Sequence, residues 1–104
     1  MRIKACLTSN SQLWETPKNI YNYFMKEGYF DPCPKNPRFD GLSIDWYKKN
    51  FVNPPYKDIK KWVAKAIVEN LKGNMTVLLV PARTDTQWFR MLYEHITKWE
   101  MFLN

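Results

Sequence analysis

The stretch Met75-Thr76-Val77-Leu78-Leu79-Val80 is a continuous apolar run with β-branched residues, and Pro81 follows it directly. An unbroken run of this kind, without alternation of polar and apolar positions, is typical of a strand buried on both faces of a parallel sheet. Proline has no backbone N–H to donate to a neighbouring strand, so we expect the strand to end at Pro81. The stretch therefore predicts a parallel sheet in an α/β fold.

The segment before this strand predicts an amphipathic helix. Between Asp58 and Lys72, apolar side chains recur at helical spacing and leave lysines on the opposite face. The apolar face consists of Ile59, Trp62, Val63, Ala66, Ile67 and Leu71. Lys72-Gly73-Asn74 closes this helix, and a second short strand, Asn50–Asn53, precedes it and is stopped by Pro54-Pro55.

The N-terminal part of the chain is less regular. Residues 1–13 are polar in pattern, and we expect them to form an irregular segment. Thr16 as N-cap and Pro17 at the first helical position predict the start of a helix, which Gly28 ends. Tyr29-Phe30-Asp31 then predicts a short strand that leads into a stiff, proline-rich loop.

The C-terminal part predicts one more helix and one more strand. Thr84-Asp85 is a plausible N-cap pair, and the apolar residues after it keep helical spacing to about Lys98. The tail Trp99–Asn104 has the composition of a further strand. Helices and strands therefore alternate along a single domain, residues 1–104, as in a partly parallel open α/β sheet flanked by helices.

Composition excludes several classes of protein. The chain has 104 residues, of which 45% are hydrophobic and 16% aromatic, so a folded domain is expected and a disordered chain is not. No apolar run reaches the roughly 20 residues needed to cross a bilayer, and no signal peptide is visible, which predicts a cytoplasmic protein without a membrane partner. Two cysteines and His95 offer no metal-ligand spacing, so no metal is expected.

The net charge of +6 predicts a polyanionic partner. Lys57 and the lysines of the following helix suit a phosphate backbone, although an ordinary solvated helix surface has the same pattern. Arg83 follows the buried strand and is a second candidate for a DNA phosphate contact. A salt bridge with Asp85 at the helix start is the alternative for Arg83.

Three polar segments follow predicted strands, where ligands bind in parallel sheets. They are Asp31-Pro32-Cys33-Pro34, Asn53-Pro54-Pro55-Tyr56 and Pro81–Asp85. We call Asn53-Pro54-Pro55-Tyr56 the proline loop. Its two prolines remove two backbone donors, so the Asn53 amide oxygen and the Pro54 carbonyl form a rigid acceptor pair, and Tyr56 offers a ring for stacking. This arrangement suits the amino group of an aromatic base such as adenine N6, although a turn after a strand is also possible.

Several motifs in the same order resemble the phage-type DNA N-6-adenine methyltransferase family. Those motifs are Trp14-Glu15-Thr16-Pro17, Phe30-Asp31-Pro32-Cys33-Pro34, Asp40-Gly41-Leu42 with Trp46, the proline loop with its preceding Phe51-Val52 and with Trp62-Val63 and Lys65-Ala66, and Pro81-Ala82-Arg83-Thr84-Asp85-Thr86 with Trp88-Phe89. The resemblance implies a Rossmann-like methyltransferase domain that transfers a methyl group from S-adenosylmethionine to adenine N6 in double-stranded DNA. It also implies that the proline loop holds a flipped adenine.

The resemblance extends to a cofactor site. It implies that Thr16, Pro17, Asp31 and Pro32 contact S-adenosylmethionine, and that Asp40 and Leu42 border its adenosine. Family members usually continue with a Gly-Arg segment and further strands, so a C-terminally short sheet is expected. Two alternatives stay open: a truncated, non-catalytic nucleic-acid-binding remnant, and a methyltransferase that acts on RNA or on a protein glutamine.

Overall fold

The computed structural model describes residues 3–8, 16–81, 86–95 and 98–102. Its centre is a four-stranded sheet in the order β2-β3-β1-β4, in which every neighbouring pair is parallel. The strands are β1 (Ile3–Thr8), β2 (Lys49–Val52), β3 (Met75–Pro81) and β4 (Lys98–Phe102). The prediction of an α/β fold with a parallel sheet is confirmed.

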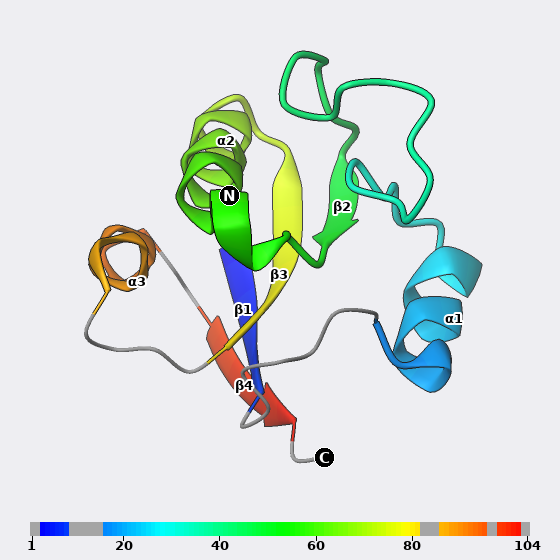
Figure 1. Cartoon of the computed structure of the whole chain (residues 1–104), viewed down its shortest axis with the longest axis horizontal. Helices are drawn as coiled ribbons and strands as arrows, with labels where there is room; N and C mark the ends of the chain where they lie inside the picture. Colours follow the sequence, from blue (N-terminus) through cyan, green and yellow to red (C-terminus); the bar gives the residue numbers. More distant parts are fainter. Residues whose placement is uncertain (1–2, 9–15, 82–85, 96–97, 103–104) are drawn as a thin grey trace.

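Helices cover both faces of this sheet (Figure 1). They are α1 (Lys18–Lys26), the 3-10 turn η1 (Tyr56–Asp58), α2 (Ile59–Leu71) and α3 (Gln87–Tyr93). Helices α2 and α3 lie on one side of the sheet, and α1 lies on the other side. The long segment between α1 and β2 arches over the start of β2 (Figure 1).

Strand β3 contributes side chains to the hydrophobic cores on both faces of the sheet. Its residues alternate between faces, so Leu78 and Val80 pack with Val52 in the core beneath α2 and α3. Val77 and Leu79 point to the opposite face, where they pack with Phe51 and the side chains of α1. Each fully buried side chain of this size stabilises the fold by about 1.5–3 kcal/mol. The expectation of a strand buried on both faces is confirmed.

The expectation of an irregular segment over residues 1–13 is wrong for Ile3–Thr8. These residues form β1, which lies between β3 and β4 in the middle of the sheet. The register pairs Ile3 with Thr76 and Cys6 with Leu79, so β1 extends the sheet along nearly all of β3. The strand was missed because Lys4 and Thr8 interrupt its short apolar pattern, and the partner that orders it is distant in sequence.

Two helix boundaries also differ from expectation. Pro17, not Thr16, occupies the N-cap position of α1, and the first helical residue is Lys18. Thr86 caps α3 by accepting a hydrogen bond from the Phe89 amide at 3.3 Å, whereas the expected cap pair Thr84-Asp85 lies outside the described residues. Helix α3 ends at Tyr93 and does not reach Lys98, which begins β4.

Tyr29-Phe30-Asp31 is not a strand in its own right. Phe30 forms a single isolated bridge to Asn50, with hydrogen bonds from the Phe30 amide to the Lys49 carbonyl at 2.9 Å and from the Phe51 amide to the Phe30 carbonyl at 2.8 Å. The prolines that follow prevent the bridge from growing into a strand. Among the helices in the described ranges, none is long and apolar enough to cross a membrane.

Candidate active site

An open cavity of about 770 Å³ is lined by two of the three polar segments, Asp31-Pro32-Cys33-Pro34 and the proline loop, whereas the third segment lies outside the described residues after Pro81. Its size falls within the range of about 300–1,000 Å³ that is usual for small-molecule sites. The lining residues are Thr16, Tyr21, Asp31, Cys33, Pro34, Lys35, Pro37, Asn53, Pro55 and Trp62. The cavity therefore unites the start of α1, the segment after Phe30, the proline loop after β2 and one residue of α2.

Asn53 and Thr16 are tied together at the wall of this cavity. The Asn53 side-chain amide donates a hydrogen bond from Nδ2 to the Thr16 hydroxyl at 3.1 Å. Thr16 is available for this contact because the N-cap position of α1 belongs to Pro17. The bond orients the Asn53 amide and leaves Oδ1 without a donor among residues 16–81 and 86–95.

The proline loop holds a second acceptor, the Pro54 carbonyl, between the two lining residues Asn53 and Pro55. The Pro55 carbonyl accepts a hydrogen bond from the Asp58 amide at 3.2 Å, which turns the chain into η1. Within the described part of the chain, no N–H donates to the Pro54 carbonyl. Pro54 itself is buried, Asn53 and Pro55 line the cavity, and Tyr56 begins η1 with 36% of its surface exposed.

Asp31 gives the cavity a partly shielded acidic group. Burial raises the pKa of the Asp31 carboxyl, while a hydrogen bond of 2.9 Å from the Cys33 amide to Oδ1 lowers that pKa. Burial and then the Asp31 charge raise the pKa of Tyr21. The same two causes raise the pKa of Cys33 to about 11, so its thiol is protonated at neutral pH and lacks the thiolate that a nucleophile needs.

Asp40-Gly41-Leu42 forms a turn beside the cavity and contributes none of its lining. The Asp40 carboxylate accepts hydrogen bonds from the Leu42 amide at 3.0 Å and from the Ser43 hydroxyl at 2.7 Å, which lower the pKa of Asp40. A Cβ at Gly41 would clash with the Pro32 carbonyl oxygen and would lie 2.8 Å from a Trp62 ring carbon. Glycine is therefore required by the close approach of Pro32, which is itself buried.

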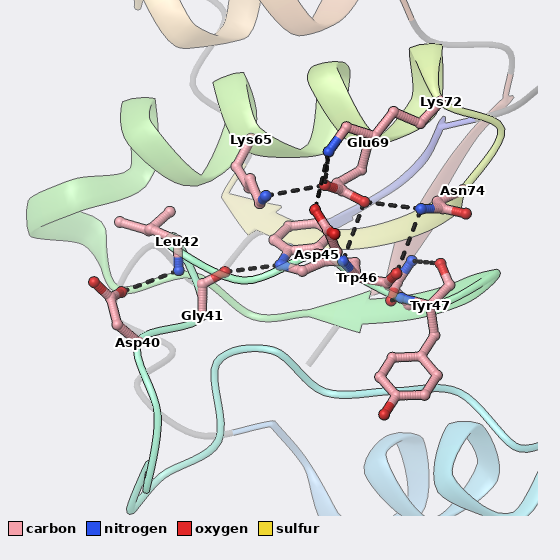
Figure 2. Close-up of polar contacts among 11 residues, drawn as sticks. Asp40, Gly41, Leu42, Asp45, Trp46, Tyr47, Lys65, Glu69, Lys72 and Asn74 are labelled. Carbon is pink, nitrogen blue, oxygen red and sulfur yellow. Dashed lines mark hydrogen bonds and ion pairs between the residues drawn. The ribbon is translucent and has the colours of Figure 1, made fainter.

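A buried carboxylate, which sequence reasoning did not single out, holds this region together (Figure 2). Glu69 has no exposed surface and accepts hydrogen bonds from the Trp46 amide at 3.1 Å, Asn74 Nδ2 at 2.8 Å, Lys65 Nζ at 2.9 Å and Lys72 Nζ at 3.2 Å. Burial raises the pKa of Glu69, but these bonds more than offset burial and lower the pKa to about 2. Trp46 in turn donates from Nε1 to the Gly41 carbonyl at 2.8 Å.

The network reaches the cavity through aromatic packing. The Trp46 ring stacks on Trp62 with centroids 6.3 Å apart, and Trp62 is a lining residue. A lone glutamate among the lysines of an amphipathic helix gives no sign in the sequence that it is buried. Tyr21, Lys35, Pro37 and Trp62 were likewise not among the expected site residues, because each lies between motifs or on the apolar face of a helix.

Of the two basic residues expected to contact DNA, Lys57 lies in the described part of the chain and Arg83 does not. Lys57 is exposed on η1, next to the proline loop. Pro17, which was expected to contact the cofactor, is half-buried at the start of α1 and does not line the cavity. In the described part of the chain, no three histidine, cysteine or acidic side chains are grouped to hold a metal ion.

Comparison with known proteins points to DNA modification. The family model "DNA N-6-adenine-methyltransferase (Dam)" matches residues 4–101. A "DNA N-6-adenine-methyltransferase" of Haemophilus phage HP1 (strain HP1c1) is 32% identical over 101 residues, which cover 80% of this chain and 57% of the phage protein. The chain thus matches little more than half the length of this relative. No solved structure matches it significantly.

Proposed function

Because the chain belongs to the DNA N-6-adenine-methyltransferase (Dam) family, we propose that it methylates the N6 amino group of adenine in DNA. In this proposal the cavity of about 770 Å³ receives the adenine after it has left the double helix, beside bound S-adenosylmethionine. The order β2-β3-β1-β4 supports the related proposal that the sheet is of the Rossmann-like methyltransferase type.

The hydrogen bond between Asn53 and Thr16 is the observation that carries the proposal. It joins two family-like motifs that are 37 positions apart in the sequence, and it does so in the wall of a cavity. It also leaves Asn53 Oδ1 available as an acceptor, next to a Pro54 carbonyl that no described N–H occupies. Two acceptors on consecutive residues match the two hydrogens of one amino group.

This acceptor pair would activate the adenine amino group. The N6 lone pair is normally delocalised into the ring, which makes the amino group a poor nucleophile. Hydrogen bonds from both N6 hydrogens to Asn53 Oδ1 and the Pro54 carbonyl localise the lone pair on nitrogen, as a preorganised site is able to do. Tyr56 would stack on the base. As the new N6–C bond forms, the bond between the methyl carbon and the sulfur would break with its electron pair left on a neutral sulfur, and N6 would release one proton to water.

The other cavity residues fit S-adenosylmethionine. When bound, the cofactor supplies a methyl group on a positively charged sulfur. Asp31 supplies negative charge, Thr16 a hydroxyl, and Tyr21 and Trp62 supply aromatic surface within the same cavity. The raised pKa of Asp31 reflects its shielding from water, which strengthens any interaction with a cation. We assign no contact to Asp40 or Leu42, since neither lines the cavity.

The charge of the chain supports double-stranded DNA as the partner. The net charge of +6 favours association with phosphates, and exposed Lys57 lies one residue beyond the proline loop. We propose that Lys57 and Arg83 contact phosphates close to the extruded base. DNA affinity that falls with increasing salt would agree with this assignment.

In the deciding experiment, the chain and methyl-labelled S-adenosylmethionine are incubated with DNA, with RNA and with protein in three separate reactions. We expect label on DNA adenine, and we expect Asn53→Ala to lose at least about 100-fold in rate, as is typical when one preorganised polar group is removed. Asn22→Ala, on the exposed side of α1, is the matched control and should keep full activity. Equal labelling by the Asn53 and Asn22 variants would remove the proposed role of Asn53.

A second measurement addresses the non-catalytic alternative. Calorimetric titration with S-adenosylmethionine should give a heat of binding if the cavity holds the cofactor. No heat of binding together with salt-dependent DNA affinity would instead identify a nucleic-acid-binding remnant. If label appears only on RNA or only on protein glutamine, that molecule and not DNA is the substrate.

A further inference from the structure

Three aromatic rings pack together beside the cavity, and two of them are exposed to solvent. The Phe30 ring stacks on Phe39 with centroids 5.9 Å apart and contacts Tyr47 with centroids 4.6 Å apart. We call these three residues the aromatic platform. Tyr47 is 65% exposed and Phe39 is 38% exposed. Phe30 packs, like the lining residue Cys33, against the core cluster that contains the lining residue Trp62, so the aromatic platform lies close to the cavity.

Buried polar groups hold the backbone of Tyr47 in place. Asn50 has no exposed surface; its Oδ1 accepts from the Tyr47 amide at 3.0 Å and its Nδ2 donates to the Tyr47 carbonyl at 2.8 Å. Glu69 fixes the preceding residue through the Trp46 amide. The Tyr47 ring nevertheless points away from α2 (Figure 2). Its backbone is therefore clamped while its ring faces solvent, an arrangement that suits a preorganised contact surface.

Around the aromatic platform the acidic side chains have partners, whereas two basic side chains form no ion pair with a described residue. The three aspartates between α1 and β2 are engaged: Asp31 accepts a hydrogen bond from the Cys33 amide, Asp40 accepts from Leu42 and Ser43, and Asp45 pairs with Lys72 at 3.2 Å. Arg38 and Lys48, which adjoin Phe39 and Tyr47 in sequence, are exposed and form no ion pair with any described residue. An exposed aromatic surface with unpaired cations at its edge fits nucleic acid, since rings stack on bases and cations contact phosphates.

We propose that the aromatic platform is a DNA-docking surface on which Tyr47 stacks against a base next to the extruded adenine, with Arg38 and Lys48 on the adjacent phosphates. The proposal rests on the proposed function, because DNA must reach the cavity for this surface to lie along its path. The prolines of the loop limit its backbone freedom, so little conformational entropy would be lost when DNA binds.

The test measures DNA affinity without S-adenosylmethionine, using the full chain and a fluorescein-labelled 20-base-pair duplex that contains one adenine–cytosine mismatch. We expect Tyr47→Ala to raise Kd at least about 5-fold, because a stacked ring contributes about 1–3 kcal/mol per base. Tyr47→Phe should bind within about 2-fold of the original chain, because the ring face is kept. Arg38→Ala should lower the slope of log K against log salt by about 1.

Tyr93→Ala is the matched control, because Tyr93 is 67% exposed but lies on α3, at the opposite side of the molecule from the segment between α1 and β2 that carries the aromatic platform (Figure 1). It should leave Kd unchanged. If Tyr47→Ala binds DNA as tightly as Tyr93→Ala, the proposal is overturned, and the aromatic platform would serve another kind of partner. If Tyr47→Ala binds DNA more weakly and the original chain transfers no methyl group, the proposed docking surface is supported and the proposed function is refuted.

Discussion

The Asn53 side-chain amide donates to the Thr16 hydroxyl at 3.1 Å and thereby joins the loop after β2 to the start of α1. Both residues line the cavity. The contact makes the direction of Asn53 Oδ1 a property of the tertiary structure. Several expected outcomes follow from this and from the network around Glu69.

Thr16→Val should impair catalysis more than stability. The substitution keeps the shape of the side chain but removes the hydroxyl that holds Asn53, and a typical hydrogen bond of this kind contributes about 0.5–1.5 kcal/mol. We expect the methylation rate to fall about 3- to 10-fold with a small change in Tm. Thr16→Ser should restore most of the rate. Equal kcat in Thr16→Val and in the original chain would show that the contact does not orient the base.

Glu69 should make stability depend on acid pH. Its pKa is about 2 in the folded chain and 4.5 in a model compound, so its ionised form stabilises the fold above about pH 4.5. This contribution, on the order of 3 kcal/mol, is lost as the pH falls through the folded-state value. Urea unfolding at pH 2.5 to 7 should show that Glu69→Gln is less stable at neutral pH and that the difference shrinks below pH 4.5. A constant difference across this range would contradict the assignment.

Gly41→Ala should destabilise the fold more than Gly28→Ala. An added Cβ at Gly41 meets the Pro32 carbonyl and Trp62, and such overpacking typically costs about 1–3 kcal/mol or more. Gly28 has φ of +82° but nothing within 4 Å of an added Cβ, so its substitution costs only about 1–2 kcal/mol of backbone strain. Thermal unfolding of both variants measures the two costs, and a lower Tm for the Gly28 variant would reverse the expected order.

Cys33→Ser should keep methylation within about 2-fold of the original rate. The thiol lines the cavity, but its pKa of about 11 leaves it protonated, and methyl transfer to an amino group needs no covalent enzyme intermediate. The labelling assay used for Asn53 measures this directly. A loss comparable to that of Asn53→Ala would give Cys33 a chemical role that its protonation state argues against.

Local sequence determined the elements whose signals are strong over a short range. The run Met75–Val80 is buried on both faces, the apolar spacing of Asp58–Lys72 forms α2, and the prolines after Val52 end β2, because burial pattern and proline stereochemistry act on neighbouring residues. The ends of the predicted strands pointed to Asp31 and Asn53, and the family resemblance added Thr16; the structure brings all three to one cavity.

Long-range packing decided what sequence alone did not reveal. Ile3–Thr8 becomes a central strand only because β3 and β4 supply its hydrogen-bonding partners. The Thr16 hydroxyl lies one residue before the N-cap of α1 and accepts a hydrogen bond from Asn53, which is 37 positions away. Glu69 accepts a hydrogen bond from the Trp46 amide, 23 positions away, and Asn50, which holds the Tyr47 backbone, also donates to the Met75 carbonyl, 25 positions away. A partner distant in the chain takes part in each of these polar networks, so no local pattern records them.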